Sequence, residues 1–189
     1  MEFFAYLNRM KYIKRWGLMH SAREENIMEH SHQAAVISHA LAVINNKIFK
    51  GSADIQKTVL YALYHETTEV ITGDLPTPVK YYNNDLKTAY KNMEKAAGQK
   101  LLSCLPPELR CEYENLILPD ISSYEYKLVK AADKLCAYIK CIEEQSFGNR
   151  EFKKAESTIK KELDVIDIPE VKYFIKEILP VYKLTIDEL

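Results

Sequence analysis

The stretch that decides the fold is EHSHQAAVISHALAVI, residues 29–44. When His30 is set at zero on a helix, four apolar residues follow at steps of four, three, four and three: Ala34, Ile37, Leu41 and Ile44. This spacing is typical of one buried face of an α-helix. His32 and His39 fall on the other side of that helix, so His30 is the histidine expected to point into the core.

The remainder of the chain also favours helices, because its 189 residues include only 5 Gly and 7 Pro. Helices are expected over 2–14, 29–47, 54–70, 86–103, 107–117, 121–147, 149–163 and 169–179. Prolines interrupt them in GDLPTPVKYYNND (73–85) and LPPEL (105–109). Neither interruption is long enough for a domain linker, so one all-α domain is predicted over residues 1–189.

Composition narrows the classes of partner. Hydrophobic residues make up 47% and charged residues 28%, and the formal net charge is -1, which predicts neither disorder nor a surface for nucleic-acid polymers. No apolar run approaches the roughly 18 residues that a membrane span needs. The four cysteines have no CxxC spacing, and no signal segment is recognised. A soluble, cytoplasmic protein with reduced thiols is expected.

The stretch LYHETTEVITGD (63–74) places a histidine and several carboxylates at the end of a predicted helix. The apolar stripe of that helix is expected at Ile55, Val59, Ala62 and Leu63. If the helix continues, Glu66 and Glu69 lie on the same buried face, with His65 on its flank. A buried carboxylate is costly unless it is paired or coordinates a metal. An ion pair of Glu66 with Lys or Arg is the alternative to a metal.

A further carboxylate, Asp133, lies at the margin of another predicted apolar face. That face consists of Leu128, Ala132, Leu135, Ile139 and Ile142. Alone, an aspartate at a helix margin is usually solvated, and an inward histidine such as His30 is usually hydrogen-bonded in a core. Together, His30, His65, Glu66 and Asp133 offer two imidazoles and two carboxylates from three helices, a set suited to a divalent first-row metal.

These residues resemble the metal signature of HD-domain phosphohydrolases, which are all-helical. The chain is most similar to the YfbR-like 5′-deoxynucleotidases, over roughly residues 5–145. The similarity is carried by RWGLM (15–19), ENIMEHS (25–31), LYALYH (60–65), EVITGDLPTPVKY (69–81) and KAADKL (130–135). The resemblance implies a helical bundle with a metal site between its central helices, on which the C-terminal helices of 149–189 pack.

The resemblance implies that His30, His65, Glu66 and Asp133 bind cobalt, manganese or another first-row divalent ion. It also implies hydrolysis of deoxynucleoside 5′-monophosphates to deoxynucleosides and phosphate. The family pattern has His-Asp where this chain has His65-Glu66, so one ligand is longer by a methylene group. That difference bears on which ion the site prefers, since geometry sets selectivity.

By the same resemblance, Glu69 is the catalytic acid or base and Asp74 is an active-site aspartate. From the sequence pattern alone, Asp74 could equally be an ordinary turn residue after Gly73.

Four residues are expected to contact substrate. Arg15 suits a phosphate group, because a guanidinium donates two parallel hydrogen bonds. The resemblance implies that Trp16 lies beside the sugar, where it disfavours a 2′-hydroxyl; a core anchor is the usual role of a tryptophan. Thr77 and Lys80 lie in a loop expected to form a pocket wall, and its prolines predict an extended path for TPVK.

Two alternative functions follow from the same residues. One is an HD-domain reaction on another nucleotide or phosphate ester, such as a pyrophosphohydrolase or triphosphohydrolase. The other is a helical binding module in which Glu66 has spoiled the metal site. The family resemblance and the 13 tyrosines are compatible with a homodimer.

Overall fold

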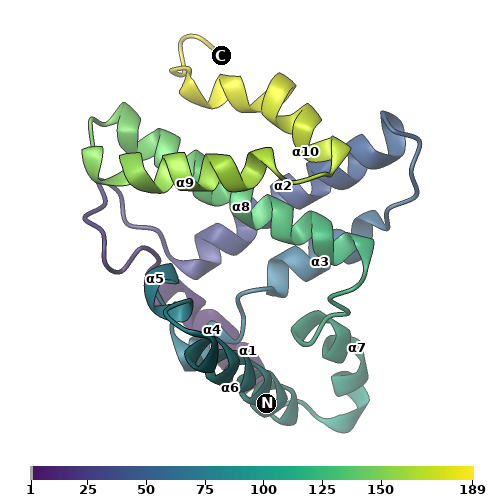
Figure 1. Ribbon diagram of the computed structural model, residues 1–189. Coiled ribbons are helices and arrows are strands. Elements are labelled where there is room, and N and C mark those ends of the chain that lie inside the picture. Colours follow the sequence, from purple (N-terminus) through teal and green to yellow (C-terminus); the bar gives the residue numbers. More distant parts are fainter. Residues whose placement is uncertain (1) are drawn as a thin grey trace.

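The computed structural model describes residues 2–189, and Met1, the first residue of the predicted domain, lies outside them. The described residues form helices and no β-strand, which confirms the predicted all-α class (Figure 1). The α-helices are α1 (Phe3–Leu7), α2 (Ile27–Lys47), α3 (Ile55–Tyr64), α4 (Glu69–Thr72), α5 (Thr77–Lys80), α6 (Asn84–Ser103), α7 (Pro107–Ile117), α8 (Tyr124–Ser146), α9 (Lys153–Asp164) and α10 (Pro169–Tyr173). Short 3₁₀ segments are η1 (Asn8–Tyr12), η2 (Arg150–Phe152) and η4 (Leu179–Lys183), and η3 (Phe174–Ile178) is a π-helical turn.

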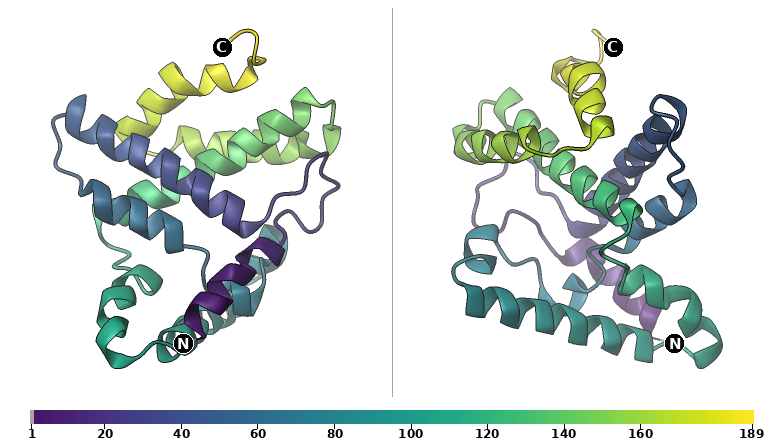
Figure 2. Two further views of the ribbon diagram at one scale, coloured as in Figure 1. Left: turned by 180° about the vertical axis from the view of Figure 1, so that it is seen from behind. Right: turned by 45° about the vertical axis from the view of Figure 1, so that its right-hand side comes forward.

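The main core lies where α2, α3 and α8 pack against one another in the middle of the molecule. Helix α9 lies along α8 (Figure 2). The C-terminal segments η3 and η4 follow α10, and η4 also contacts α8. Within residues 2–189, no helix combines the length and apolar character that crossing a bilayer requires.

Helix α2 has the buried face that its sequence predicts. The Asn26 side chain accepts hydrogen bonds of 3.0 Å from the backbone nitrogens of both Met28 and Glu29, so the helix begins two residues before the predicted start. Its buried stripe comprises Ala34, Ile37, Leu41 and Ile44. His30 is fully buried, whereas His32 and His39 are exposed. Helix α8 likewise buries its predicted face.

A second, smaller core joins α1, α6 and α7 in the lower part of Figure 1. Its buried members are Phe3, Leu101, Leu102, Leu105 and Ile117. Gly98 allows the end of α7 to approach α6, because a Cβ there would meet Leu118 Cδ2 at 2.8 Å. Tyr64 and Val70 also pack on this core. The turn between them is therefore held where the two cores meet.

The predicted helix over 54–70 is interrupted after Tyr64. Residues 65–68 form a turn, and the chain continues as the one-turn helix α4. Hydrogen bonds to the third preceding residue define this turn, from Thr67 N to Tyr64 O and from Glu69 N to Glu66 O, each 3.0 Å. The neighbouring β-branched Thr67 and Thr68 favour a helix poorly.

The predicted buried face of this helix is also partly wrong. Ala62 is buried, but Leu63 is 41% exposed, and Ile55 and Val59 are only partly buried. The fully packed positions are Thr58, Tyr61 and Ala62. Thr58 takes a core position because its hydroxyl donates to Asp54 O at 2.6 Å, which satisfies the buried polar atom.

Two further predictions differ from the structure. TPVK is not extended: Thr77–Lys80 is the one-turn helix α5, because Pro78 stands in its first turn, where a missing N–H costs no hydrogen bond. The helix expected over 2–14 divides into α1 and η1, and Ile13 already has extended backbone angles.

Candidate metal centre and active site

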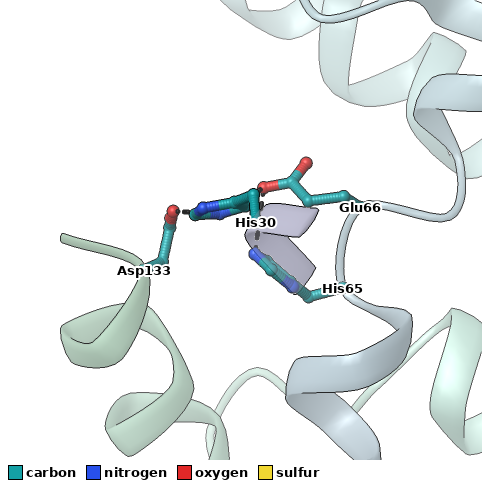
Figure 3. Close-up of side chains that lie close together, drawn as sticks. All are labelled: His30, His65, Glu66 and Asp133. Atoms are coloured by element: carbon teal, nitrogen blue, oxygen red, sulfur yellow. Dashed lines mark hydrogen bonds and ion pairs between the residues drawn. The ribbon is translucent and has the colours of Figure 1, made fainter. Parts of the chain in front are cut away.

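Four side chains predicted to bind a metal converge at the centre of the molecule (Figure 3). His30 comes from the first turn of α2, His65 and Glu66 from the turn after α3, and Asp133 from the middle of α8. One ligand atom of each lies within 4.8 Å of the others. Atoms bonded to one ion at about 2.0–2.2 Å lie within about 4.4 Å of one another, so the group has nearly the size of a one-ion site.

Individual distances show how the group is arranged. His30 Nε2 lies 3.1 Å from Asp133 Oδ1 and 3.8 Å from Glu66 Oε1. His65 Nε2 lies 3.0 Å from Glu66 Oε1. The two imidazole rings are 5.2 Å apart between centroids. Two imidazole nitrogens and two carboxylate oxygens thus gather around one point.

The orientation of His65 fits a metal ligand. Its Nδ1 lies 2.6 Å from Ala62 O, and a carbonyl can only accept a hydrogen bond, so the Nδ1 atom carries the proton. The Nε2 atom is buried and has no hydrogen-bond partner, which leaves its lone pair directed into the group. A backbone carbonyl that fixes the tautomer in this way is typical of metal-binding histidines. The donor set therefore fits a divalent first-row ion.

The two carboxylates of the group are held in the ionised form. Burial raises the pKa of Glu66, whereas His65 and Arg15 lower it, and together they keep that pKa well below its usual range. Burial likewise opposes ionisation of Asp133, but Lys130 and His30 together outweigh burial, so the pKa of Asp133 is also well below its usual range. Lys130 Nζ donates to Asp133 Oδ2 at 2.7 Å, on the side away from His30. Two anionic oxygens remain directed at the shared point.

Arg15 enters the same region from the segment before α2. Its Nη1 atom lies 3.8 Å from Glu66 Oε1, within ion-pair range but farther than His65. Burial lowers the pKa of Arg15, whereas the nearby carboxylates, Glu66 first, raise it above its ordinary value. The structure therefore contains the Glu66–Arg ion pair that was the alternative to a metal, and it also brings the four predicted ligands together.

Glu69 lies at the start of α4, and its side chain is only 4% exposed. Its Oε2 atom is buried without a hydrogen-bond partner. Burial, reinforced by the charge of Glu66, raises the pKa of Glu69 to about 11, so this carboxyl group holds a proton at neutral pH. The prediction that Glu69 faces inward is confirmed, although the helix expected to carry it is interrupted.

The other predicted site residues have different surroundings. Asp74 follows Gly73, whose φ of 73° turns the chain after α4, and burial raises the pKa of Asp74 while Arg15 opposes that rise. Lys80 Nζ is held by Glu94 Oε1 at 3.0 Å and lies 4.2 Å from the ring centroid of Tyr90. Thr77 is exposed, and no described contact joins it to the four-residue group.

Trp16 adopts a conformation that its sequence did not reveal. Its φ is 60°, in the left-handed region that bulky residues rarely enter. The indole Nε1 donates to Glu25 Oε2 at 2.9 Å, and the ring lies 5.2 Å from that of Phe152 between centroids. Trp16 is thus anchored from two sides next to Arg15.

Three residues near the site were not singled out from sequence. Glu25 lies inside ENIMEHS and Lys130 begins KAADKL, so both stand in the motifs that carry the resemblance. Glu144 has no such signal. It is buried on α8 and accepts hydrogen bonds from the backbone of Ala22 and Arg23, which holds the segment before α2 in place.

Comparison with known proteins identifies similar sequences. A protein of Yersinia pestis (strain Pestoides F) named 5′-deoxynucleotidase is 47% identical over 189 residues, covering 100% of this chain and 96% of the relative. A protein of the same name from Yersinia pseudotuberculosis serotype O:3 (strain YPIII) matches equally well. These relatives extend the similarity from the predicted motifs to the whole chain.

Solved structures share the fold. The crystal structure of an HD-domain phosphohydrolase from Listeria innocua has a TM-score of 0.84 and 24% identity, covering 96% of this chain and 88% of that chain. The HD phosphohydrolase DatZ of cyanophage S-2L, bound to dA and one catalytic Zn²⁺ ion, has a TM-score of 0.65 and 18% identity, with 96% of each chain covered. The model of the family described as 5′-deoxynucleotidase YfbR-like matches residues 2–182, and the chain therefore belongs to that family.

Proposed function

We propose that this protein is a metal-dependent 5′-deoxynucleotidase, which hydrolyses deoxynucleoside 5′-monophosphates to deoxynucleosides and phosphate. The observation that carries the proposal is the convergence of His30, His65, Glu66 and Asp133, which brings two imidazoles and two ionised carboxylates to one point. Family membership supports the substrate class.

These four residues would hold the ion, which we propose is cobalt, manganese or another first-row divalent metal. When bound, such an ion supplies Lewis-acid stabilisation to a phosphoryl oxygen. Glu66 takes the place of the family aspartate. Because it stands in a turn and not within a helix, its longer side chain still reaches within 3.0 Å of His65 Nε2.

The neighbouring residues supply the remaining chemistry. Arg15 is buried, permanently charged and close to Glu66, so its guanidinium donates to phosphate oxygens. Glu69 holds a proton at a buried carboxyl and gives it to the O5′ atom as the P–O5′ bond breaks. Water adds to phosphorus; one of its protons stays on the phosphate and the other restores the proton of Glu69. Asp74 orients that water or Arg15. Trp16 borders the sugar and disfavours a 2′-hydroxyl.

A single phosphate suits the local charges better than a polyphosphate. Lys80 is engaged by Glu94, and Lys130 is engaged by Asp133, which leaves Arg15 as the buried cation beside the group. A triphosphate would call for more Arg and Lys contacts. In this proposal Lys80 reaches substrate only after leaving Glu94, and Thr77 forms part of the outer wall.

The assembly and location follow from the same proposal. We propose that residues 1–189 form one HD domain acting in the cytoplasm as a homodimer. The exposed Val79, Tyr81 and Tyr82 form an apolar and aromatic run next to the site and are compatible with a subunit contact. Light scattering during gel filtration measures the mass of the assembly directly.

The test is a phosphate-release panel with mono-, di- and triphosphates of deoxy- and ribonucleosides. The chelated protein is supplemented in turn with Mn²⁺, Co²⁺, Zn²⁺ and Mg²⁺. Release from deoxynucleoside monophosphates with one transition metal is expected. His30→Ala should abolish it, whereas His39→Ala, on the exposed side of the same helix, should not. Preferred release from a triphosphate, or none with any metal, would contradict the proposal.

A further inference from the structure

The segment before α2 brings Glu25 back beside Arg15 and Trp16. The backbone N–H of Arg15 donates to Glu25 O at 2.9 Å, and that of Ile27 donates to Ile13 O at 3.0 Å. These two bonds pair residues 13–15 with 25–27 in antiparallel fashion. This pairing fixes the backbone of Glu25 two residues before the start of α2, the helix that carries His30.

The Glu25 carboxylate contacts three site residues and is itself only 12% exposed. Its Oε2 atom accepts the hydrogen bond of the Trp16 indole at 2.9 Å and lies 3.7 Å from Arg15 Nε. Its Oε1 atom lies 3.6 Å from His30 Nδ1. One carboxylate thus lies next to three residues with different proposed roles: Trp16 at the sugar, Arg15 at the phosphate and His30 at the metal.

Two of these neighbours are buried nitrogens that lack a hydrogen-bond partner, Arg15 Nε and His30 Nδ1. Buried N–H groups are rarely left unpaired, so each such group calls for an explanation. Both lie within ion-pair range of Glu25, a few tenths of an ångström beyond a hydrogen bond. Hydrogen bonds at active sites are often long in the free protein and shorten when the site is loaded.

The backbone of Trp16 adds an independent observation. A bulky residue at a φ of 60° is strained, and such strain persists only where surrounding contacts hold it. Here the hydrogen bond to Glu25 and the contact with Phe152 hold the indole. Loss of the Glu25 bond would let Trp16 leave this conformation.

We propose that Glu25 is a positioning residue that orients His30 as a ligand and fixes Trp16 and Arg15 against the substrate, an inference that rests on the proposed function. Its Oε1 atom accepts the Nδ1 proton of His30, so that Nε2 of that ring, which lies 3.1 Å from Asp133 Oδ1, faces the metal position. Carboxylates behind metal-binding histidines fix the tautomer and ring orientation in this way. Its Oε2 atom holds the indole against the sugar side.

Two variants separate these two tasks. Glu25→Gln keeps an oxygen that can accept from Trp16 but loses the charge and one acceptor, so metal affinity should fall by about 10–100-fold while the indole stays in place. Glu25→Ala should lower the metal affinity and also release the indole from its position. The matched control is Glu24→Ala, the adjacent residue, whose carboxylate pairs with Lys14 on the exposed surface.

Three measurements apply to each variant. Calorimetric titration of the chelated protein with Mn²⁺ reports metal affinity. Trp16 is the only tryptophan, so its emission maximum and acrylamide quenching report the indole directly. The ratio of kcat/KM for dAMP to that for AMP reports sugar selection. Glu25→Ala should shift the emission, increase quenching and lower this ratio by about tenfold or more.

The outcomes are distinct. The inference would be overturned if Glu25→Ala had the same emission maximum as Glu24→Ala, and if its quenching, Mn²⁺ affinity and ratio of kcat/KM values lay within twofold of those of Glu24→Ala. If Glu25→Ala does not fold, unchanged metal affinity in Glu25→Gln overturns it instead. A wild-type protein that released no phosphate would contradict the proposed function, while the Mn²⁺ and fluorescence measurements would still decide the role of Glu25.

Discussion

The buried pair Lys140–Glu144 on α8 should stabilise the protein by holding the segment that carries the proposed substrate contacts. Glu144 is only 1% exposed, and its carboxylate accepts from Ala22 N at 2.7 Å, Lys140 Nζ at 2.6 Å and Asn149 Nδ2 at 2.8 Å. Lys140 also donates to Arg23 O at 2.6 Å. The perturbation is Glu144→Gln, which keeps the size of the side chain and removes its charge.

The magnitude follows from the pKa of Glu144. Burial raises this pKa, but the hydrogen bonds from Lys140 and from the backbone of Ala22 outweigh burial and lower it from 4.5 to about 2. A tenfold change in proton affinity is worth about 1.4 kcal/mol, so the difference corresponds to about 3 kcal/mol of folding free energy. Because the folded pKa is depressed, this contribution is complete above pH 4.5 and is lost as pH falls towards 2.

The assay is urea unfolding of wild type and Glu144→Gln at pH 7 and at pH 3. We expect the variant to be less stable by about 3 kcal/mol at pH 7, and by about half of that at pH 3. The control is Glu177→Gln, which removes an exposed partner of Lys176 and should cost under about 1 kcal/mol. Equal unfolding free energies for wild type and Glu144→Gln at pH 7 would refute the reasoning, as would a gap that does not change with pH.

Two further predictions concern the proposed site. Glu69→Ala should lower kcat for dAMP by about 10²–10⁴-fold while metal content, measured by elemental analysis, stays at the wild-type value, because the buried Glu69 acts on a proton and not on the ion. Loss of metal together with activity would make Glu69 a ligand instead. Glu66→Asp should keep or raise turnover and alter the order of preferred metals in the same phosphate-release panel, since it restores the family ligand. A folded Glu66→Asp protein without bound metal would mean that the site has been rebuilt around glutamate.

Most helices, and the buried faces of α2 and α8, were predictable because they depend on nearby residues. A stripe such as that of α2 needs only the order of apolar residues and a period of 3.6, and the Asn26 cap acts within three residues. Breaks inside a helical pattern are harder to predict. The turn at 65–68 depends on the packing of Tyr64 and Val70 on the second core. The spacing of apolar residues along the sequence does not reveal this packing.

The contacts around Glu25 could not be predicted because they join segments through backbone pairing and not through periodicity. Residues 13–15 and 25–27 meet only after the intervening segment has folded back, and Glu144, more than a hundred residues away in sequence, holds that segment. The left-handed backbone of Trp16 leaves no mark in composition either, since a tryptophan is among the residues least expected there.

His65 and Glu66 come together by a geometry other than the one that the sequence predicts. In a continuous helix, His65 and Glu66 would point about 100° apart and would approach one point only from the side. The turn removes that constraint, and His65 Nε2 and Glu66 Oε1 come within 3.0 Å. Such a turn can absorb a small shift in backbone more readily than a helix, whose residues are fixed by successive hydrogen bonds. The extra methylene of glutamate, placed at this turn, is therefore compatible with the convergence of the four side chains.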